Sequence, residues 1–512
     1  MNGGAVIEPT AAGASEQTQL PGGPGGPGGP GGPGGPGGVP QSRIAHAFSI
    51  QLICRALGML ASVVSVAMTA RYLGPDRYGQ LMVAVAFIGM WTSMTDLGIG
   101  TVIVRRVTSG RGELERLVQV NSGLSLVYCV PLAAIAAGIG WLIYRDADVR
   151  VMLVVLSGQL LMLTMRTRFE PVFLSTVRFS AVAISDVAGR LGTLATVSWL
   201  VTTHQGVIWF AVAQLIPPVL QLLIQGTAAA RHIKLRPVFS TRESADLLRE
   251  SLPLMGVAVV GILYWRADGV ILSLLSTHVE VGVYGLAYTI AFNTEALSVF
   301  FQKSTLSTAT GLYSRDVGAY VGFLRRSVEL MFFVALPVAV VGTLLAAPLI
   351  NLFGDQDFVR RGAPTLALLL IAASLRFVTG TLGQGLFASH EQRFFFRLFV
   401  ATLVVNVALN LFLDSQFGAI GAGIALVCTE LFGMTLASWR LRSQCGYHTP
   451  VRFLVRLLVP TAASAAIVLL LSGQQVIFVL AAAAATYLAV NMVFGPVKWS
   501  TLTSLFQRQV TP

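Results

Sequence analysis

The stretch LYWRADGVILSLLS, residues 263–276, places Arg266 and Asp268 inside an apolar run that extends over residues 252–276. A helix of about 20 apolar residues crosses the roughly 30 Å hydrocarbon core of a bilayer. Charge inside such a helix is costly, and it usually faces the interior of a helix bundle or a water-filled cavity. The stretch therefore predicts a membrane helix with a functional charge on its inner side.

Similar apolar runs follow one another along the whole chain. The 512 residues are 54% hydrophobic and 11% charged, and their mean hydropathy is +0.73. Soluble domains carry about 25% charged residues. A soluble all-α fold is disfavoured, because many of these runs lack a polar face. The pattern predicts an all-α polytopic membrane protein with about 14 transmembrane helices.

A weak internal repeat predicts two lobes of six helices plus two extra C-terminal helices. Tyr78-Gly79 and Tyr284-Gly285 each follow a short loop between two apolar runs, and Arg55 and Arg266 lie in the preceding helices. Repeated halves are common in transporters, which bind substrate between them. The predicted regions are a disordered Gly/Pro-rich cytoplasmic tail (1–43), an N-terminal lobe of helices 1–6 (44–229), a basic cytoplasmic linker (230–251), a C-terminal lobe of helices 7–12 (252–443), and helices 13 and 14 with a short tail (444–512).

Lys and Arg concentrate in alternate connections between the predicted helices, as at Arg105, Arg106 and Arg111. The positive-inside rule assigns such connections to the cytoplasm, so both termini are predicted to be cytoplasmic. This accounts for the net charge of +12, and no nucleic-acid partner is expected. The four cysteines have no paired spacing, so neither a metal site nor a cofactor is predicted.

Charged residues inside the predicted helices are the candidate site. The basic ones are Arg55, Arg190, Arg266 and Arg376, and the acidic ones are Asp186, Asp268, Glu295 and Glu430. Arginine donates two parallel hydrogen bonds to phosphate and stays charged, so these arginines are predicted to bind pyrophosphate. The acids would balance their charge or take up a proton or sodium ion. Structural ion pairing is the alternative, above all for Asp186 and Arg190, which stand i, i+4.

Three longer stretches carry a family resemblance: ARYLGPDRYGQLMVAVAFIGMWTSMTDLGIGTVIVRR (70–106), LYWRADGVILSLLSTHVEVGVYGLAYTI (263–290) and NVALNLFLDSQFGAIGAGIALVCTE (406–430). They resemble the polysaccharide transporter family, the Wzx-like O-antigen and oligosaccharide flippases of the multidrug/oligosaccharidyl-lipid/polysaccharide superfamily. In the second, Trp265 intervenes between Tyr264 and Arg266 of the family's tyrosine-arginine-aspartate pattern. The Gly/Pro tail also departs from the family pattern.

The resemblance implies a flippase of the bacterial plasma (inner) membrane, not an enzyme. Its substrate would be a polyprenyl-pyrophosphate-linked oligosaccharide that moves from the inner to the outer leaflet by alternating access. Membrane lipids and polysaccharide polymerase or ligase machinery would be its partners. An ion-coupled drug or metabolite exporter of the same superfamily is the alternative. A membrane glycosyltransferase, polymerase or ligase is disfavoured, because no sizeable outer loop is available to carry catalytic residues.

Overall fold

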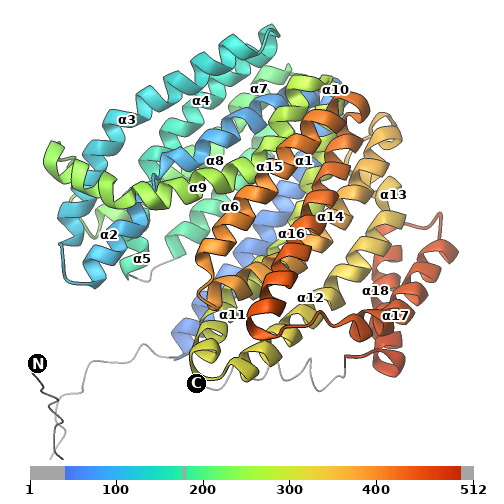
Figure 1. Cartoon of the computed structure of the whole chain (residues 1–512). Helices are drawn as coiled ribbons and strands as arrows, with labels where there is room; N and C mark the ends of the chain where they lie inside the picture. Colours follow the sequence, from blue (N-terminus) through green and yellow to red (C-terminus); the bar gives the residue numbers. More distant parts are fainter. Residues whose placement is uncertain (1–40, 177–179, 498–512) are drawn as a thin grey trace, which may run out of the picture. The chain divides into compact units, whose positions relative to one another are not determined.

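The computed structural model describes residues 41–176 and 180–497, and every regular element in these ranges is a helix (Figure 1). Side chains are described from Leu57 onward, except at residues 93, 175–176, 257–258, 262 and 265. The N-terminal helices are α1 (Gln41–Trp91), η1 (Thr92–Thr95), α2 (Ile99–Thr108), α3 (Leu114–Ile143), α4 (Ala147–Thr167), α5 (Glu170–Thr176), α6 (Ser180–Thr202), α7 (Val207–Ala213) and α8 (Ile216–Ala230).

The second half of the chain continues this pattern. Its helices are α9 (Thr241–Leu275), α10 (His278–Asn293), α11 (Ala296–Arg315), α12 (Val317–Leu344), α13 (Ala346–Phe353), α14 (Gln356–Ala388), α15 (Gln392–Phe417), α16 (Ala419–Cys445), α17 (Val451–Leu470) and α18 (Val476–Phe494). The predicted linker is partly helical, because residues 241–251 form the first turns of α9. Ser240 caps this helix by accepting a hydrogen bond from the Glu243 N–H.

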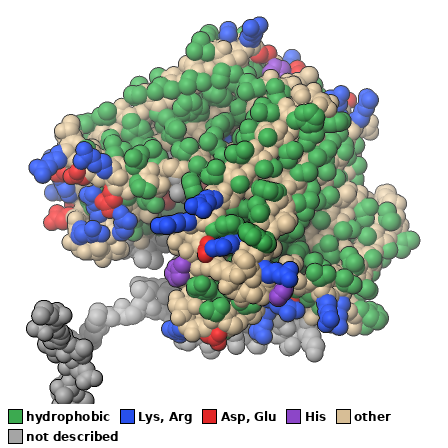
Figure 2. Space-filling model, viewed as in Figure 1, with side chains coloured by type: hydrophobic (Ala, Val, Ile, Leu, Met, Phe, Trp, Pro, Cys, Tyr) green, Lys and Arg blue, Asp and Glu red, His purple; other side chains and the backbone are tan. Residues whose placement is uncertain are grey.

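The all-α polytopic prediction is confirmed. Within the described ranges, ten helices are long and apolar enough to cross a membrane, or eleven if the bent α9 forms one span. The predicted number of fourteen crossings stays a prediction. The region of α1 in which two spans were predicted contains a break, since Gly74 has a φ of 68° and is followed by Pro75. On the face drawn in Figure 2, hydrophobic side chains dominate along the helices, and charged ones gather mainly toward the helix ends.

Connections that lie between the Lys- and Arg-rich ones, and are therefore predicted to be external, meet at one end of the bundle. We call this end the outer end. Arg71 of α1 donates hydrogen bonds to the carbonyl oxygens of Asn351 and Gly354, both at 2.9 Å, where α13 ends. A cation at a helix C-terminus also complements the helix dipole. Glu280 of α10 pairs with Arg361 of α14 and accepts the backbone N–H of α16's first residue at 2.9 Å. The N-terminal and C-terminal helices are therefore joined at this end.

Two glycines let α1 and α10 cross at the outer end with their backbones in contact. A Cβ on Gly79 would lie 1.8 Å from the His278 carbonyl oxygen, and one on Gly282 would lie 2.2 Å from the Pro75 carbonyl oxygen. Only glycine permits such an approach. These reciprocal contacts pair Gly79 with Gly282, three residues before the Gly285 that the sequence repeat aligned with it.

The hydrophobic cores show where the two halves are joined and where they are separate. One large core combines Tyr78 and Leu81 of α1 with Val281 of α10 and with Ile350 and Phe358 of α13 and α14. Away from the outer end, a core around Ile99 belongs to α2, α3 and α9, and another belongs to α11, α12, α14 and their neighbours. Burial of apolar surface is shared at the outer end and divided at the opposite end.

Adding a methyl group at the crossing should weaken the outer end. We expect Gly282→Ala to lower the stability of the folded protein by about 1–3 kcal/mol, because neither backbone can move away without disturbing the shared core. The midpoint of thermal unfolding of the purified protein would measure this. Gly138→Ala in α3 is the matched control, since nothing lies within 4 Å of the added Cβ. Equal midpoints for the two variants would contradict the tight crossing.

Candidate functional site

Arg266 lies where α9 passes between the two halves of the protein. The helix bends by 51° between Thr241–Gly261 and Arg266–Leu275. The Arg266 side chain is exposed, and it forms no ion pair with any described residue. It lies over Gly89 of α1, where an added Cβ would come 3.5 Å from the Arg266 Nε. An arginine from the C-terminal half thus faces the N-terminal half with its donors available to a ligand.

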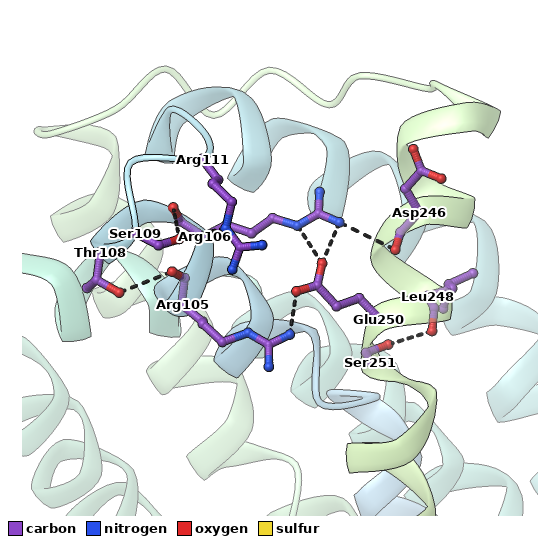
Figure 3. A network of polar contacts seen from close by, with 9 residues as sticks. All are labelled: Arg105, Arg106, Thr108, Ser109, Arg111, Asp246, Leu248, Glu250 and Ser251. Atoms are coloured by element: carbon purple, nitrogen blue, oxygen red, sulfur yellow. Dashed lines mark hydrogen bonds and ion pairs between the residues drawn. The ribbon is translucent and has the colours of Figure 1, made fainter. Parts of the chain in front are cut away.

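The first half of α9 is held by α2 and α3. Figure 3 shows Arg105 and Arg106 of α2 pointing toward Glu250 of α9. Arg106 donates to the Glu250 carboxylate from Nε at 2.7 Å, and Arg105 pairs with the same carboxylate. Arg116 of α3 donates to Glu243 at 2.9 and 3.1 Å. The N-terminal half therefore anchors one end of α9, whereas Tyr264 and Asp268 further along the helix bond to α16 and α10, and α9 also packs along α15.

A buried ion pair uses two of the predicted residues. Arg376 of α14 donates from Nε to Glu430 of α16 at 2.7 Å, and Tyr264 of α9 donates to the same oxygen at 2.8 Å. The Arg376 guanidinium also lies 4.9 Å from the Phe292 ring centroid and 5.2 Å from that of Tyr264. Arg376 is only 6% exposed. The Arg376–Glu430–Tyr264 contacts join α14, α16 and α9, and the Glu430 carboxylate already compensates the charge of the guanidinium.

A second buried group surrounds Asp268. Tyr284 of α10 donates a hydrogen bond to Asp268, and the carboxylate interacts electrostatically with Asp414 of α15. Asp414 is 1% exposed, and neither carboxylate oxygen has a hydrogen-bond partner among the described residues. The side-chain oxygen of Asn410, one helical turn away, also lacks a described partner. We call Asp268, Tyr284, Asn410 and Asp414 the carboxylate cluster.

The charged residues of the N-terminal half form a separate group. Arg190 of α6 donates from Nε to Asp186 at 3.0 Å and from Nη1 to Ser62 of α1 at 2.7 Å. This is the i, i+4 pair that the sequence offered as an alternative to a binding role. Both side chains are more than one-third exposed. Their pairing divides the predicted arginines between two places instead of one cavity.

The remaining predictions are placed as follows. Arg55 lies outside the residues whose side chains are described. Glu295 is buried at the break between α10 and α11, where it interacts with Arg376 and Glu430. Neither Asp414 nor Asn410 is among the candidate site residues predicted from the sequence. The i, i+4, i+8 spacing of Asn406, Asn410 and Asp414 on one helix face could have revealed a polar stripe.

Solved structures with the same arrangement of helices are membrane transporters. "Lipid II flippase MurJ, inward closed conformation" aligns with a TM-score of 0.74 at 14% identity, covering 90% of this chain and 99% of that chain. A multidrug resistance MATE family transporter of the MOP superfamily aligns in its inward-facing conformation with a TM-score of 0.62 at 16% identity, covering 78% of this chain and 98% of that one. A MATE family transporter of the same superfamily in its outward-facing conformation aligns with a TM-score of 0.52 at 17% identity, covering 79% of this chain and 97% of that chain. No curated protein sequence matches the chain.

These likenesses and the apolar helices define the class: the protein is a multi-pass membrane protein with the fold of the MOP superfamily of flippases and exporters. The profile of the family described as "Polysaccharide biosynthesis protein" matches residues 45–305, just over half of the chain. The chain therefore belongs to this family, and the resemblance drawn from its sequence is confirmed.

Loss of the shared carboxylate should loosen the first half of α9. We expect Glu250→Gln to increase amide hydrogen exchange in residues 241–256 without affecting residues 266–275. The free energy of local opening in this segment should fall by about 0.5–1 kcal/mol, because partly exposed ion pairs contribute little to stability. Glu113→Gln is the control, since Glu113 is exposed and has no described ion pair. Charge exchange in Arg106→Glu/Glu250→Arg should restore part of the protection, and unchanged exchange in Glu250→Gln would contradict the anchoring role.

Proposed function

We propose that the protein is a flippase that moves polyprenyl-pyrophosphate-linked oligosaccharide, a precursor of cell-surface polysaccharide, from the inner to the outer leaflet. The family and fold support a flippase, and the chemistry of the interior argues for the substrate. Joined cores at the outer end and separate cores at the opposite end suit alternating access from the cytoplasm. The proposed location is the bacterial plasma membrane, with both termini cytoplasmic. Polysaccharide polymerase or ligase machinery is the proposed partner.

Arg266 is the observation that carries this proposal. Arg376 and Arg190 already have carboxylate partners, whereas Arg266 is exposed and unpaired among the described residues. A guanidinium in the interior of a bundle calls for an anion, and its fork matches phosphate oxygens. Because Arg266 faces Gly89 of the other half, a pyrophosphate bound to Arg266 would lie at the boundary between the two halves.

Transport would be coupled to a cation through the carboxylate cluster. Two buried carboxylates that repel each other are stable together only if one is protonated or a cation lies between them. The unpartnered oxygens of Asp414 and Asn410 are the hard ligands that sodium favours. Of the coupling candidates in the sequence analysis, Asp268 belongs to this cluster, whereas Asp186 and Glu430 are held in ion pairs.

An ion-coupled drug or metabolite exporter is the second candidate. The exporter folds among the solved structures support it. An unpaired interior arginine argues against cationic drugs, because like charges repel in a region of low dielectric.

Removal of the Arg266 guanidinium should stop flipping without preventing membrane insertion. A deletion strain complemented with Arg266→Ala should accumulate polyprenyl-pyrophosphate glycans, as the uncomplemented strain does. Loss of a charge-assisted hydrogen bond costs about 1.5–3 kcal/mol, which corresponds to a roughly ten- to hundredfold lower affinity for the substrate. Lipid mass spectrometry measures the accumulation. Arg242→Ala on the same helix is the control and should clear the lipids. Normal clearance by Arg266→Ala would overturn the assignment of this arginine, and unchanged lipids in the deletion strain would favour an exporter.

Asp414→Asn should abolish stabilisation by the coupling cation. We expect the thermal midpoint of the wild-type protein to rise with sodium concentration, because a ligand that binds only the folded state stabilises it. The variant should start from a higher midpoint, since an uncompensated buried charge is removed, and should not respond to sodium. Asp76→Asn, at an exposed position, is the control. Equal sodium responses in Asp414→Asn and wild type would show that this cluster is not the cation site.

A further inference from the structure

A pocket of about 330 Å³, lined by both polar and apolar side chains, lies within the N-terminal half of the protein. Helices α1, α6 and α8 surround it. Its lining includes Ser62, Ser65, Asp186, Arg190, Thr193 and Gln221. Small-molecule sites have volumes of about 300–1,000 Å³, so the cavity can receive a compact ligand group. Nothing in the cation-coupling or pyrophosphate roles accounts for this concentration of hydroxyl and amide groups.

The charge of the cavity argues against an anion. Its one described arginine, Arg190, already shares its Nε proton with Asp186 at 3.0 Å. A phosphate placed on Arg190 would lie close to this carboxylate, and the repulsion would offset the attraction. Gln221 of α8 also approaches Asp186, with its Nε2 atom 3.5 Å from Oδ1. Because the arginine and the carboxylate in the lining are already paired with each other, the cavity suits an uncharged ligand that both donates and accepts hydrogen bonds.

Ser65 is the side chain that points to a ligand. It is 6% exposed, and its hydroxyl has no hydrogen-bond partner among the described residues. A buried hydroxyl without a partner destabilises a protein, so it is usually satisfied by water or a ligand. The neighbouring Thr69 does not satisfy it, because Thr69 donates to the Ser65 backbone carbonyl at 2.8 Å. The apolar side chains of Val66, Leu81 and Pro217 line other parts of the cavity.

We propose that this cavity binds an uncharged sugar unit of the lipid-linked glycan, while Arg266 in the C-terminal half binds the pyrophosphate. A sugar offers vicinal hydroxyl groups to the Asp186–Arg190 pair and to Ser65, and it turns its apolar C–H face to the apolar lining. The inference rests on the proposed flippase function and deepens it. It reassigns Arg190 from the phosphates to the glycan, and it divides substrate recognition between the two halves.

Binding of two lipids to the purified full-length protein in nanodiscs tests the proposal. The probes are polyprenyl pyrophosphate and the same lipid carrying one hexose or one N-acetylhexosamine. We expect a sugar-bearing lipid to bind the wild-type protein more tightly. Ser65→Ala and Gln221→Leu should each lower the affinity for the sugar-bearing lipid by about three- to tenfold, the effect of one lost hydrogen bond. Neither variant should change the affinity for polyprenyl pyrophosphate. Arg266→Gln should lower the affinity for both kinds of lipid.

The controls separate a ligand role from a structural one. Ser65→Ala should leave the thermal midpoint unchanged or raise it, because it removes an unpaired buried hydroxyl. Thr227→Val, at an exposed position on α8, should bind both lipids as wild type does. Equal losses for both lipids in Ser65→Ala, or no preference of the wild type for either sugar, would overturn the sugar site. Failure of the wild type to bind any of the lipids would instead overturn the proposed function.

Discussion

The cost of placing charge inside an apolar helix bundle is the constraint on which the structure depends. A guanidinium or carboxylate in such a place needs a partner, water or a ligand. Arg376 and Glu430 meet this need with each other and with Tyr264, so they hold three helices together. Arg266 has no described partner and stays exposed, and Asp414 is buried without one. The same physical rule therefore separates the charges that hold the bundle together from those for which we propose a ligand.

The helix α9 connects these groups to the two halves of the protein. Its first half is bound to α2 and α3 through Glu243 and Glu250. Its second half contacts C-terminal helices through Tyr284 and N-terminal helices at Gly89 and Tyr144. Arg266 and Asp268 lie just beyond the bend between these halves. Movement of one half of the protein against the other would thus change the surroundings of the arginine and of the carboxylate cluster together. This linkage offers a physical route by which a cation bound at Asp268 would affect an anion bound at Arg266.

In the proposed alternating access, the outer end would be the pivot. At this end the two halves share a hydrophobic core, the Gly79–Gly282 crossing and the bonds from Arg71 to the end of α13. At the opposite end, the described clusters join the N-terminal helices only to the first half of α9. In the proposed function, an arrangement that is joined at one end and divided at the other would admit a large headgroup from one side of the membrane only. The neutral N-terminal cavity and the cationic Arg266 would then offer different chemistry to the sugar and phosphate parts of the proposed substrate.

The sequence by itself determined the class of fold, the family and the identity of most buried charges. Apolar runs of membrane-spanning length and charge inside them are local properties, so they can be read without knowing which helices meet. Pairing could be read only where both partners lie on one helix, as for Asp186 and Arg190. Only the tertiary structure decided that Arg376 is neutralised by Glu430, that Arg266 is available, and that Asp414 joins Asp268, because these contacts bring together helices distant in sequence. For the same reason the crossing of Gly79 and Gly282 could not be predicted. A glycine in the sequence can indicate a close helix approach, but it does not show which helix lies opposite.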